Sequence, residues 1–139
     1  MLILKRKESF CASHRLFNPA WSEEKNFEVY GKCAHKHGHG HNYQLEVCLK
    51  GEIDPHTGMV FSLSELKNII QSEVLDDVDH KHLNFDVPWL AGKVPTSEVL
   101  AQCIWERLDL RLKSAGTNAF LYAVTVFETD KNSATKLLE

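Results

Sequence analysis

Alternation of apolar and polar residues predicts two long strands in the first third of the chain. Residues 2–14, LILKRKESFCASH, keep apolar side chains on one parity, and residues 39–49, HGHNYQLEVCL, repeat the pattern. Because successive side chains of a strand point to opposite faces, each segment has one face suited to a core. Arg6 and Glu8 interrupt the first apolar row, so we expect the beginning of that strand to lie at an edge or an interface.

Helical spacing of apolar residues predicts two longer helices in the second half of the chain. An S-x-x-E capping box at Ser62 precedes a helix from about Leu63 to Asp76. The tripeptide PTS at residues 95–97 precedes a second helix that ends near Gly116. Both segments place their apolar residues on one face, which indicates helices that cover a sheet.

The remaining segments complete an α+β pattern. Residues 119–138 read as an alternating strand, a turn at the sequence DKN and a return strand, and residues 59–63, MVFSL, predict a short additional strand. A short helix is possible at residues 23–30. The order strand, strand, helix, helix, strand, strand over residues 1–139 predicts one α+β domain.

Four histidines at alternate positions stand at the start of the second long strand: His35, His37, His39 and His41. In an extended chain His39 and His41 project from the same face, with roots roughly 6–7 Å apart, so both imidazoles can reach one ion. Glycines alternate with these histidines and leave the other face bare. The alternative interpretation is a solvated, histidine-rich loop that binds metal adventitiously.

His14 closes the apolar face of the first long strand. A lone histidine in that position is usually a core residue that is hydrogen-bonded to backbone. Together with His39 and His41, however, it would supply three nitrogen ligands from two neighbouring strands and leave one position open. That arrangement is typical of a catalytic zinc site, whereas structural zinc sites are usually closed by cysteines.

Carboxylates at three positions are further candidates. Asp79 and His80 are adjacent and can form an acid–imidazole pair, although solvated turn residues give the same pattern. Glu128 ends an otherwise apolar row, where a carboxylate needs a partner such as a guanidine-like edge; a surface position at the strand end is the alternative. Glu98 lies in the first turn of the second helix, where the helix dipole alone explains it.

Composition and charge exclude several classes of protein. The chain is 43% hydrophobic and 25% charged with a formal net charge of −3, which argues against nucleic-acid or membrane binding based on bulk charge. Its amino terminus has a three-residue apolar run before a basic cluster, too short for a signal peptide or a membrane span. We therefore expect a cytosolic protein whose four cysteines are free thiols.

Six separated motifs, in order, resemble the 6-pyruvoyltetrahydropterin synthase family: FCASHRL, YGKC-x5-HGHNY, GEIDPHTGMV, VDHKHLN, PTSE and VFET. They extend over nearly the whole chain, so the resemblance is specific. It implies a tunnelling fold, in which a four-stranded antiparallel sheet carries two helices on one face. It also implies assembly into a trimeric barrel and stacking of two trimers into a hexamer, which would cover the edges of the sheet.

The resemblance also implies a substrate, 7,8-dihydroneopterin triphosphate, and a role for each candidate residue. His14, His39 and His41 match the ligands of Zn²⁺, and Cys33 matches the general base. The remaining matches are Asp79 with His80 as the pair that activates the base, Glu128 as the pterin anchor, and Thr96, Ser97 and Glu98 as residues near the pterin. A zinc-polarised substrate and a thiolate base are chemically coherent, and no redox cofactor is required.

Three functions remain open at this point. The five residues between Cys33 and His39 resemble the enzymes that make 6-pyruvoyltetrahydropterin, whereas PTSEVLA resembles those that make 6-carboxytetrahydropterin for queuosine and release acetaldehyde. We favour the pyruvoyl product. A non-enzymatic metal-storage protein, in which all four alternating histidines are ligands, is the third possibility, but it has no use for Cys33, Asp79, His80 and Glu128 together.

Overall fold

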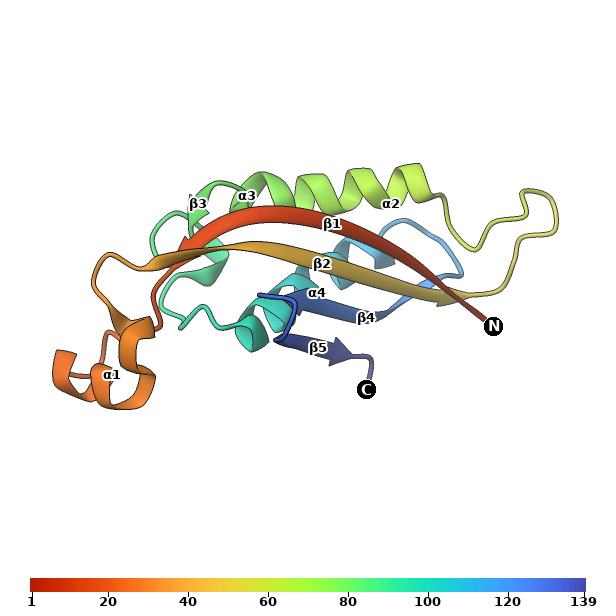
Figure 1. Cartoon of the computed structure of the whole chain (residues 1–139). Helices are drawn as coiled ribbons and strands as arrows, with labels where there is room; N and C mark the ends of the chain where they lie inside the picture. The colour runs from red at the N-terminus through yellow and green to blue at the C-terminus, as the bar shows by residue number, and fades with distance from the viewer.

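The computed structural model describes residues 1–139 and shows a curved sheet with the helices that follow residue 60 on one side, while the helix at residues 23–30 lies beyond one end of the sheet (Figure 1). The strands are β1 (Leu2–His14), β2 (His39–Gly51), β3 (Lys81–His82), β4 (Phe120–Phe127) and β5 (Ser133–Leu137). The helices are α1 (Glu23–Tyr30), α2 (Leu63–Ile70), α3 (Asp76–Val78) and α4 (Ser97–Lys113), and the short helical turns are η1 (Gly31–Ala34), η2 (Gln71–Leu75) and η3 (Pro88–Leu90). The predicted order of the main elements is confirmed.

The sheet has five strands in the order β3-β1-β2-β4-β5. Neighbours among β1, β2, β4 and β5 are antiparallel, as expected. The expectation of four strands is wrong by one, because β3 pairs in parallel with Ala12 and Ser13 of β1. A strand of two residues is too short to show the alternation by which strands are recognised in a sequence.

No strand forms at residues 59–63, so that prediction is wrong. The backbone N–H of Asp54 donates to the carbonyl of Met59 over 2.9 Å, which closes the preceding loop on itself. Ser62 already caps α2, and Phe61 is buried in the core. The apolar residues of this segment therefore serve packing rather than a strand ladder.

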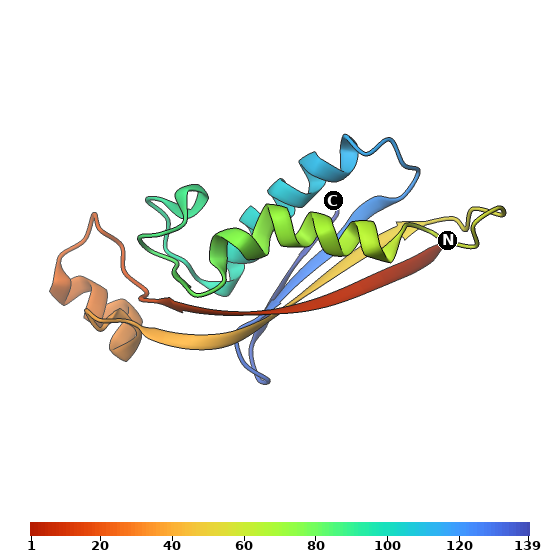
Figure 2. The ribbon, with the colours of Figure 1, turned by 90° about the horizontal axis from the view of Figure 1, so that it is seen from above.

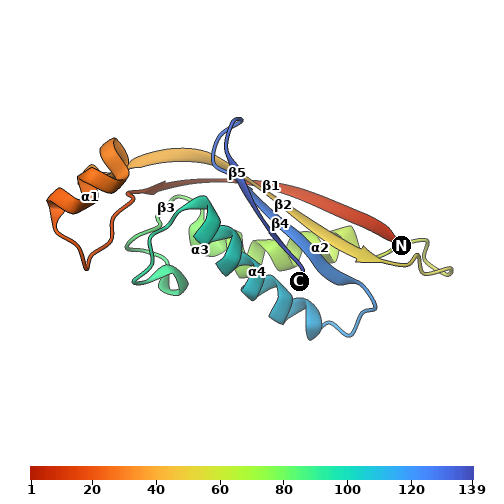
Figure 3. The same cartoon turned by 90° about the horizontal axis from the view of Figure 1, so that it is seen from below.

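Helices α2 and α4 cover one face of the sheet, as the views from above and below show (Figures 2 and 3). Between them lies a core of 27 buried residues. Tyr43, Leu45, Val47 and Leu49 of β2 are fully buried there, in the alternation that their sequence predicts. Burying each such side chain contributes about 1.5–3 kcal/mol, so this face holds the strand in register.

The helix predicted at Leu63–Asp76 is present and continues to Val78 through α2, η2 and α3. Its middle section, η2, is a π turn, which breaks the regular hydrogen-bond ladder. Arg107 of α4 braces this turn, because its Nε donates to the carbonyl of Glu73 over 2.7 Å and its guanidinium stacks over the ring of Trp89. None of the helices combines the length and the apolar character that crossing a bilayer requires.

Candidate functional site

The three predicted histidines meet where β1 ends and β2 begins. The antiparallel register pairs His14 with His39 and Ala12 with His41, so all three imidazoles project from the same face. The Nε2 atoms of His14 and His39 lie 3.1 Å apart, and one ligand nitrogen from each of the three rings falls within 4.8 Å of the others. The cluster inferred from parity is therefore confirmed.

The Nε2 atoms of the three rings lie at the centre of the cluster, and the hydrogen bonds of His14 orient its ring. His14 Nδ1 lies 2.8 Å from the carbonyl of Pro95 and, as the donor, keeps the lone pair of Nε2 free. Tyr43 places its hydroxyl 3.3 Å from the same Nδ1. His41 Nε2 is buried and has no hydrogen-bond partner in the chain, which is costly for a polar atom unless a ligand occupies the space.

This geometry fits a tetrahedral metal ion. Nitrogen ligands about 2.0–2.1 Å from Zn²⁺ lie about 3.3–3.4 Å from one another, close to the 3.1 Å between His14 and His39 Nε2, and all three ligand nitrogens lie within 4.8 Å. Burial lowers the pKa values of His14 and His39 below the ordinary value for histidine, because a charged ring loses solvation. Neutral imidazoles are the form that binds metal, so burial also prepares the donors.

Burial of His14 leads us to expect that the metal-free protein loses stability as the pH falls below about 6.5. The unfolded chain takes up a proton near the ordinary histidine pKa of 6.5, whereas the folded chain does so only at lower pH. Stability is therefore complete above that value and is lost below it, by about 1.4 kcal/mol for each unit of pKa depression. Thermal unfolding in chelator across this range measures the effect. His14→Gln should flatten the pH dependence, and equal slopes for the two proteins would contradict the assignment.

A pocket of about 380 Å³ opens between the start of α4 and the β4–β5 turn. It is lined by Leu16, Thr96, Ser97, Glu98, Glu128, Asn132 and Ser133. The structure thus brings together all four residues that the resemblance places near the pterin. Sequence reasoning missed Leu16, Asn132 and Ser133, which lie in loops or at a strand end without a pattern of their own.

Glu128 links this pocket to the histidine cluster. Its Oε1 lies 3.6 Å from His41 Nε2, and its Oε2 lies 4.0 Å from His14 Nε2. The hydroxyl of Ser97 donates to the same carboxylate over 3.3 Å. Glu128, which ends the apolar row of β4, is therefore a half-buried carboxylate between the pocket and the imidazoles. It is not a surface residue.

Cys33 lies in η1, the turn that follows α1, and its side chain is half-buried. Its backbone carbonyl accepts a hydrogen bond of 2.8 Å from the N–H of Leu16, which continues from β1. Its thiol makes no hydrogen bond with Asp79 or His80 within one chain. The predicted base therefore stands near the end of β1, but the chain by itself does not join it to its predicted activating pair.

Asp79 and His80 do form the predicted pair, at the outer edge of β1. His80 Nδ1 lies 3.1 Å from the Asp79 carboxylate, which also accepts the N–H of Cys11 over 2.9 Å. These donors, the Cys11 N–H first, lower the pKa of Asp79. His80 has a φ of 61°, which is unusual for a residue other than glycine, and its ring is 80% exposed. The pair therefore projects from an edge of the sheet that β3 covers only at Ala12 and Ser13.

The other histidines of the region stay outside the cluster. His35 and His37 are exposed and lie beside each other, with ring centres 5.9 Å apart. His82 packs on the ring of Phe85. Only two of the four alternating histidines thus meet His14, which does not favour a metal-storage protein that uses all four.

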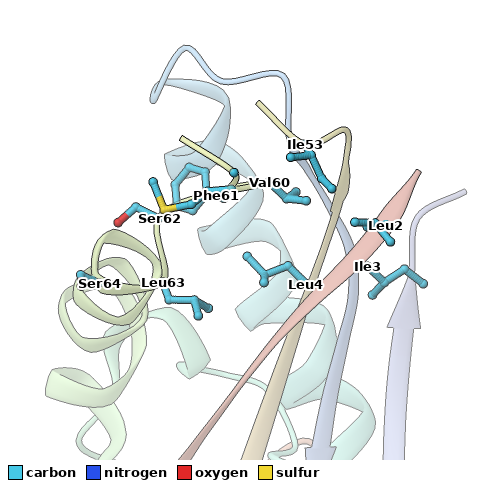
Figure 4. Close-up of a pocket in the computed structure, with 11 residues that line it drawn as sticks. Leu2, Ile3, Leu4, Ile53, Val60, Phe61, Ser62, Leu63 and Ser64 are labelled. Atoms are coloured by element: carbon cyan, nitrogen blue, oxygen red, sulfur yellow. The ribbon is translucent and has the colours of Figure 1, made fainter. Parts of the chain in front are cut away.

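A second pocket, of about 470 Å³, lies at the opposite end of β1 (Figure 4). Its walls include Leu2 and Ile3 from β1 and Val60, Phe61 and Leu63 from the segment that leads into α2. None of its lining residues is titratable, so this pocket offers no general acid or base. The chemistry of the molecule is concentrated at the histidine end of β1.

Fold and site together define an α+β protein with a three-histidine cluster that could hold a metal ion, beside a pocket that contains two carboxylates. The sequence model of the family described as 6-pyruvoyl tetrahydropterin synthase matches residues 3–137. The chain belongs to this family.

Individual relatives agree with this assignment. The chain is 45% identical over 129 residues to the 6-pyruvoyl tetrahydrobiopterin synthase of Drosophila melanogaster, covering 93% of this chain and 75% of that protein. It is 44% identical over 129 residues to the Homo sapiens protein of the same name, with 93% and 86% covered. The solved structure of Caenorhabditis elegans 6-pyruvoyl tetrahydropterin synthase superposes with a TM-score of 0.89 at 42% identity, covering 99% of this chain and 96% of that one.

Proposed function

We propose that the protein is a zinc-dependent 6-pyruvoyltetrahydropterin synthase that converts 7,8-dihydroneopterin triphosphate by elimination of triphosphate and internal proton transfer. The relatives with that name support the reaction. The observation that carries the proposal is the buried Nε2 of His41, which has no hydrogen-bond partner and lies with two further imidazoles beside the pocket that contains Glu128. Residues 1–139 share one core, in agreement with a single synthase domain.

Zinc is the metal that suits this donor set. Three neutral nitrogens and no thiolate leave one position for substrate, the arrangement of catalytic zinc sites, whereas Mg²⁺ and Ca²⁺ prefer oxygen ligands. Bound there by His14, His39 and His41, zinc would polarise a side-chain oxygen of the substrate and acidify the adjacent C–H. The Pro95 carbonyl would hold the His14 ring in the tautomer that binds the metal.

The pocket beside the histidines suits the pterin ring. Glu128 would accept hydrogen bonds from the ring's N–H groups, since a half-buried carboxylate is a strong acceptor for a guanidine-like edge. Ser97 orients this carboxylate through its hydroxyl. Thr96 and Glu98 line the same pocket and would contact the pterin from the start of α4. The substrate's side chain would then point from the pocket toward the imidazoles.

Proton removal is assigned to Cys33, with Asp79 and His80 as the pair that activates the thiol. A thiolate near an imidazolium is an effective base. Because Asp79 and His80 lie at the outer edge of β1, next to the short strand β3, a second chain docked along that edge would bring its own Cys33 to them. The outer edge of β5, and that of β1 outside Ala12 and Ser13, have no partner strand and support this assembly, since unpaired strand edges favour pairing with another chain. We therefore propose a trimeric barrel or a dimer of trimers.

Assembly is expected to be required for turnover. Sedimentation velocity should show a trimer or a hexamer as the active species, because catalytic groups come from different chains in this proposal. Mixing Cys33→Ala with His80→Ala should restore part of the activity that each lacks, since a mixed oligomer contains some intact sites. An active monomer, or no restoration after exchange of subunits, would contradict shared sites.

Product analysis tests the proposed reaction directly. The purified zinc-loaded protein is incubated with 7,8-dihydroneopterin triphosphate, and the products are identified by mass. We expect 6-pyruvoyltetrahydropterin and free triphosphate. Release of acetaldehyde with 6-carboxytetrahydropterin would identify the queuosine branch instead, and no turnover with several metal ions per chain would favour metal storage. The expected compartment is the cytosol, where the free cysteines of the chain would remain reduced.

A further inference from the structure

Arg15, the residue after the metal-binding His14, is nearly buried although it carries a charge. Its residue exposure is 8%. Its Nε and Nη2 both donate to the backbone carbonyl of Ala34, over 3.2 Å and 2.6 Å. The planar guanidinium thus donates two hydrogen bonds to one carbonyl oxygen. A lysine ammonium on its flexible side chain does not reproduce this geometry.

The surroundings of Arg15 compensate its charge only in part. The guanidinium stacks on the ring of Phe17, 3.8 Å from its centre, and lies 3.6 Å from the carboxylate of Glu23. Glu23 is largely exposed, so water weakens this ion pair. A buried charge with so little compensation is costly to keep. Its main specific contact is the Ala34 carbonyl.

That carbonyl belongs to the residue that follows Cys33. On the other side, the carbonyl of Cys33 itself accepts the N–H of Leu16. Cys33 is therefore held by two consecutive residues, Arg15 and Leu16, which continue directly from His14. The hydrogen-bonded connection from His14 to Cys33 therefore runs through only these two residues.

The side chain of Asn84 holds the backbone of Arg15 through two hydrogen bonds. Its Oδ1 accepts the Arg15 N–H over 2.9 Å, and its Nδ2 donates to the Arg15 carbonyl over 3.0 Å. The segment after β3 is thereby tied to the end of β1, so Arg15 is fixed at its backbone as well as at its guanidinium. A rigid support of this kind is what places a side chain accurately.

We propose that Arg15 is a positioning residue, which fixes the Cys33 turn relative to the three-histidine centre through the Ala34 carbonyl. This inference rests on the proposed role of Cys33 as the base. Its consequence is that loss of the guanidinium loosens the turn while the histidine ligands stay in the β1–β2 ladder. The substitution changes no residue that lines the pterin pocket, so the defect should appear in kcat rather than in KM.

The test compares Arg15→Ala and Arg15→Lys with the wild-type oligomer. For Arg15→Ala we expect kcat to fall about ten- to a hundredfold, the loss that a misplacement near 1 Å can cause, with KM and metal content nearly unchanged. Arg15→Lys keeps the charge, and its kcat should lie between those of the wild type and Arg15→Ala. If Arg15→Ala does not fold, Arg15→Lys alone decides the question, and wild-type kcat for it would overturn the proposal.

Alkylation of cysteines by iodoacetamide, followed residue by residue with mass spectrometry, separates positioning from general destabilisation and requires no turnover. Cys48 and Cys103 are buried and report global opening. We expect the Arg15 variants to raise the alkylation rate of Cys33 severalfold without raising the rates of these two. Equal acceleration at all three, or an unchanged rate at Cys33, would overturn the proposal even if kcat falls. If Cys33→Ala instead kept wild-type turnover, the assignment of Cys33 as the base would be refuted. The alkylation rates would still show whether Arg15 positions the Cys33 turn.

Arg107→Ala is the matched control. Arg107 also donates to a backbone carbonyl and stacks on an aromatic ring, but its carbonyl is that of Glu73 in the π turn. Its loss should lower the melting temperature without a selective change at Cys33. A selective acceleration of Cys33 in this variant would overturn the inference, because any lost arginine brace would then have the same effect.

Discussion

Replacing Cys33 by alanine is expected to lower turnover by roughly two to four orders of magnitude, the range for loss of a positioned base. Zinc content and pterin binding should persist, because the three imidazoles and the pocket at Glu128 are not altered. Steady-state kinetics at saturating substrate measure the loss. Elemental analysis and pterin fluorescence establish that the variant is loaded and competent to bind.

Glu128→Ala is the contrasting variant for this experiment. It should weaken pterin binding as well as turnover, because the ring's N–H groups would lose their acceptor. If Cys33 is only a small apolar residue in a turn, Cys33→Ala should be nearly silent. A Cys33→Ala enzyme that keeps more than about half of its turnover would therefore remove the thiol from the mechanism, given the much larger loss expected of a base.

The second large effect is expected at the metal. Wild-type protein should bind about one zinc per chain, and His39→Ala should lower the affinity by more than about a hundredfold, since even loss of a supporting hydrogen bond costs 10- to 100-fold. The reason is that two imidazoles remain where three converge. Metal content after dialysis and competition with a chelator give the measurement.

His35→Ala and His37→Ala provide the controls for His39→Ala. These residues lie in the same histidine-rich segment, but their rings are exposed and outside the cluster. Both variants should therefore keep zinc near the wild-type level. Similar losses of zinc from the variants at positions 35, 37 and 39 would mean that the whole segment binds metal. That result would contradict the assignment of the site to His14, His39 and His41.

The sequence alone was sufficient where a residue's position follows from local periodicity. In a strand the side-chain period is two, so the apolar row of β2 determined its buried face and placed His39 and His41 together. His14 was identified by the same parity in β1. The start of α2 followed from Ser62, whose hydroxyl accepts the N–H of Glu65 as a helix cap should.

Tertiary structure decided whatever depends on contacts between distant segments. The bond from His14 to the Pro95 carbonyl spans 81 positions, and no local pattern identifies its acceptor. The same holds for β3, which exists only because β1 offers it an edge, and for the meeting of Glu128 with Ser97. Periodicity in a strand reports which face a side chain occupies, whereas the partner on that face is chosen by how loops and helices return to it. That is why the histidines could be read from the chain, while the groups that orient them could be found only in the folded molecule.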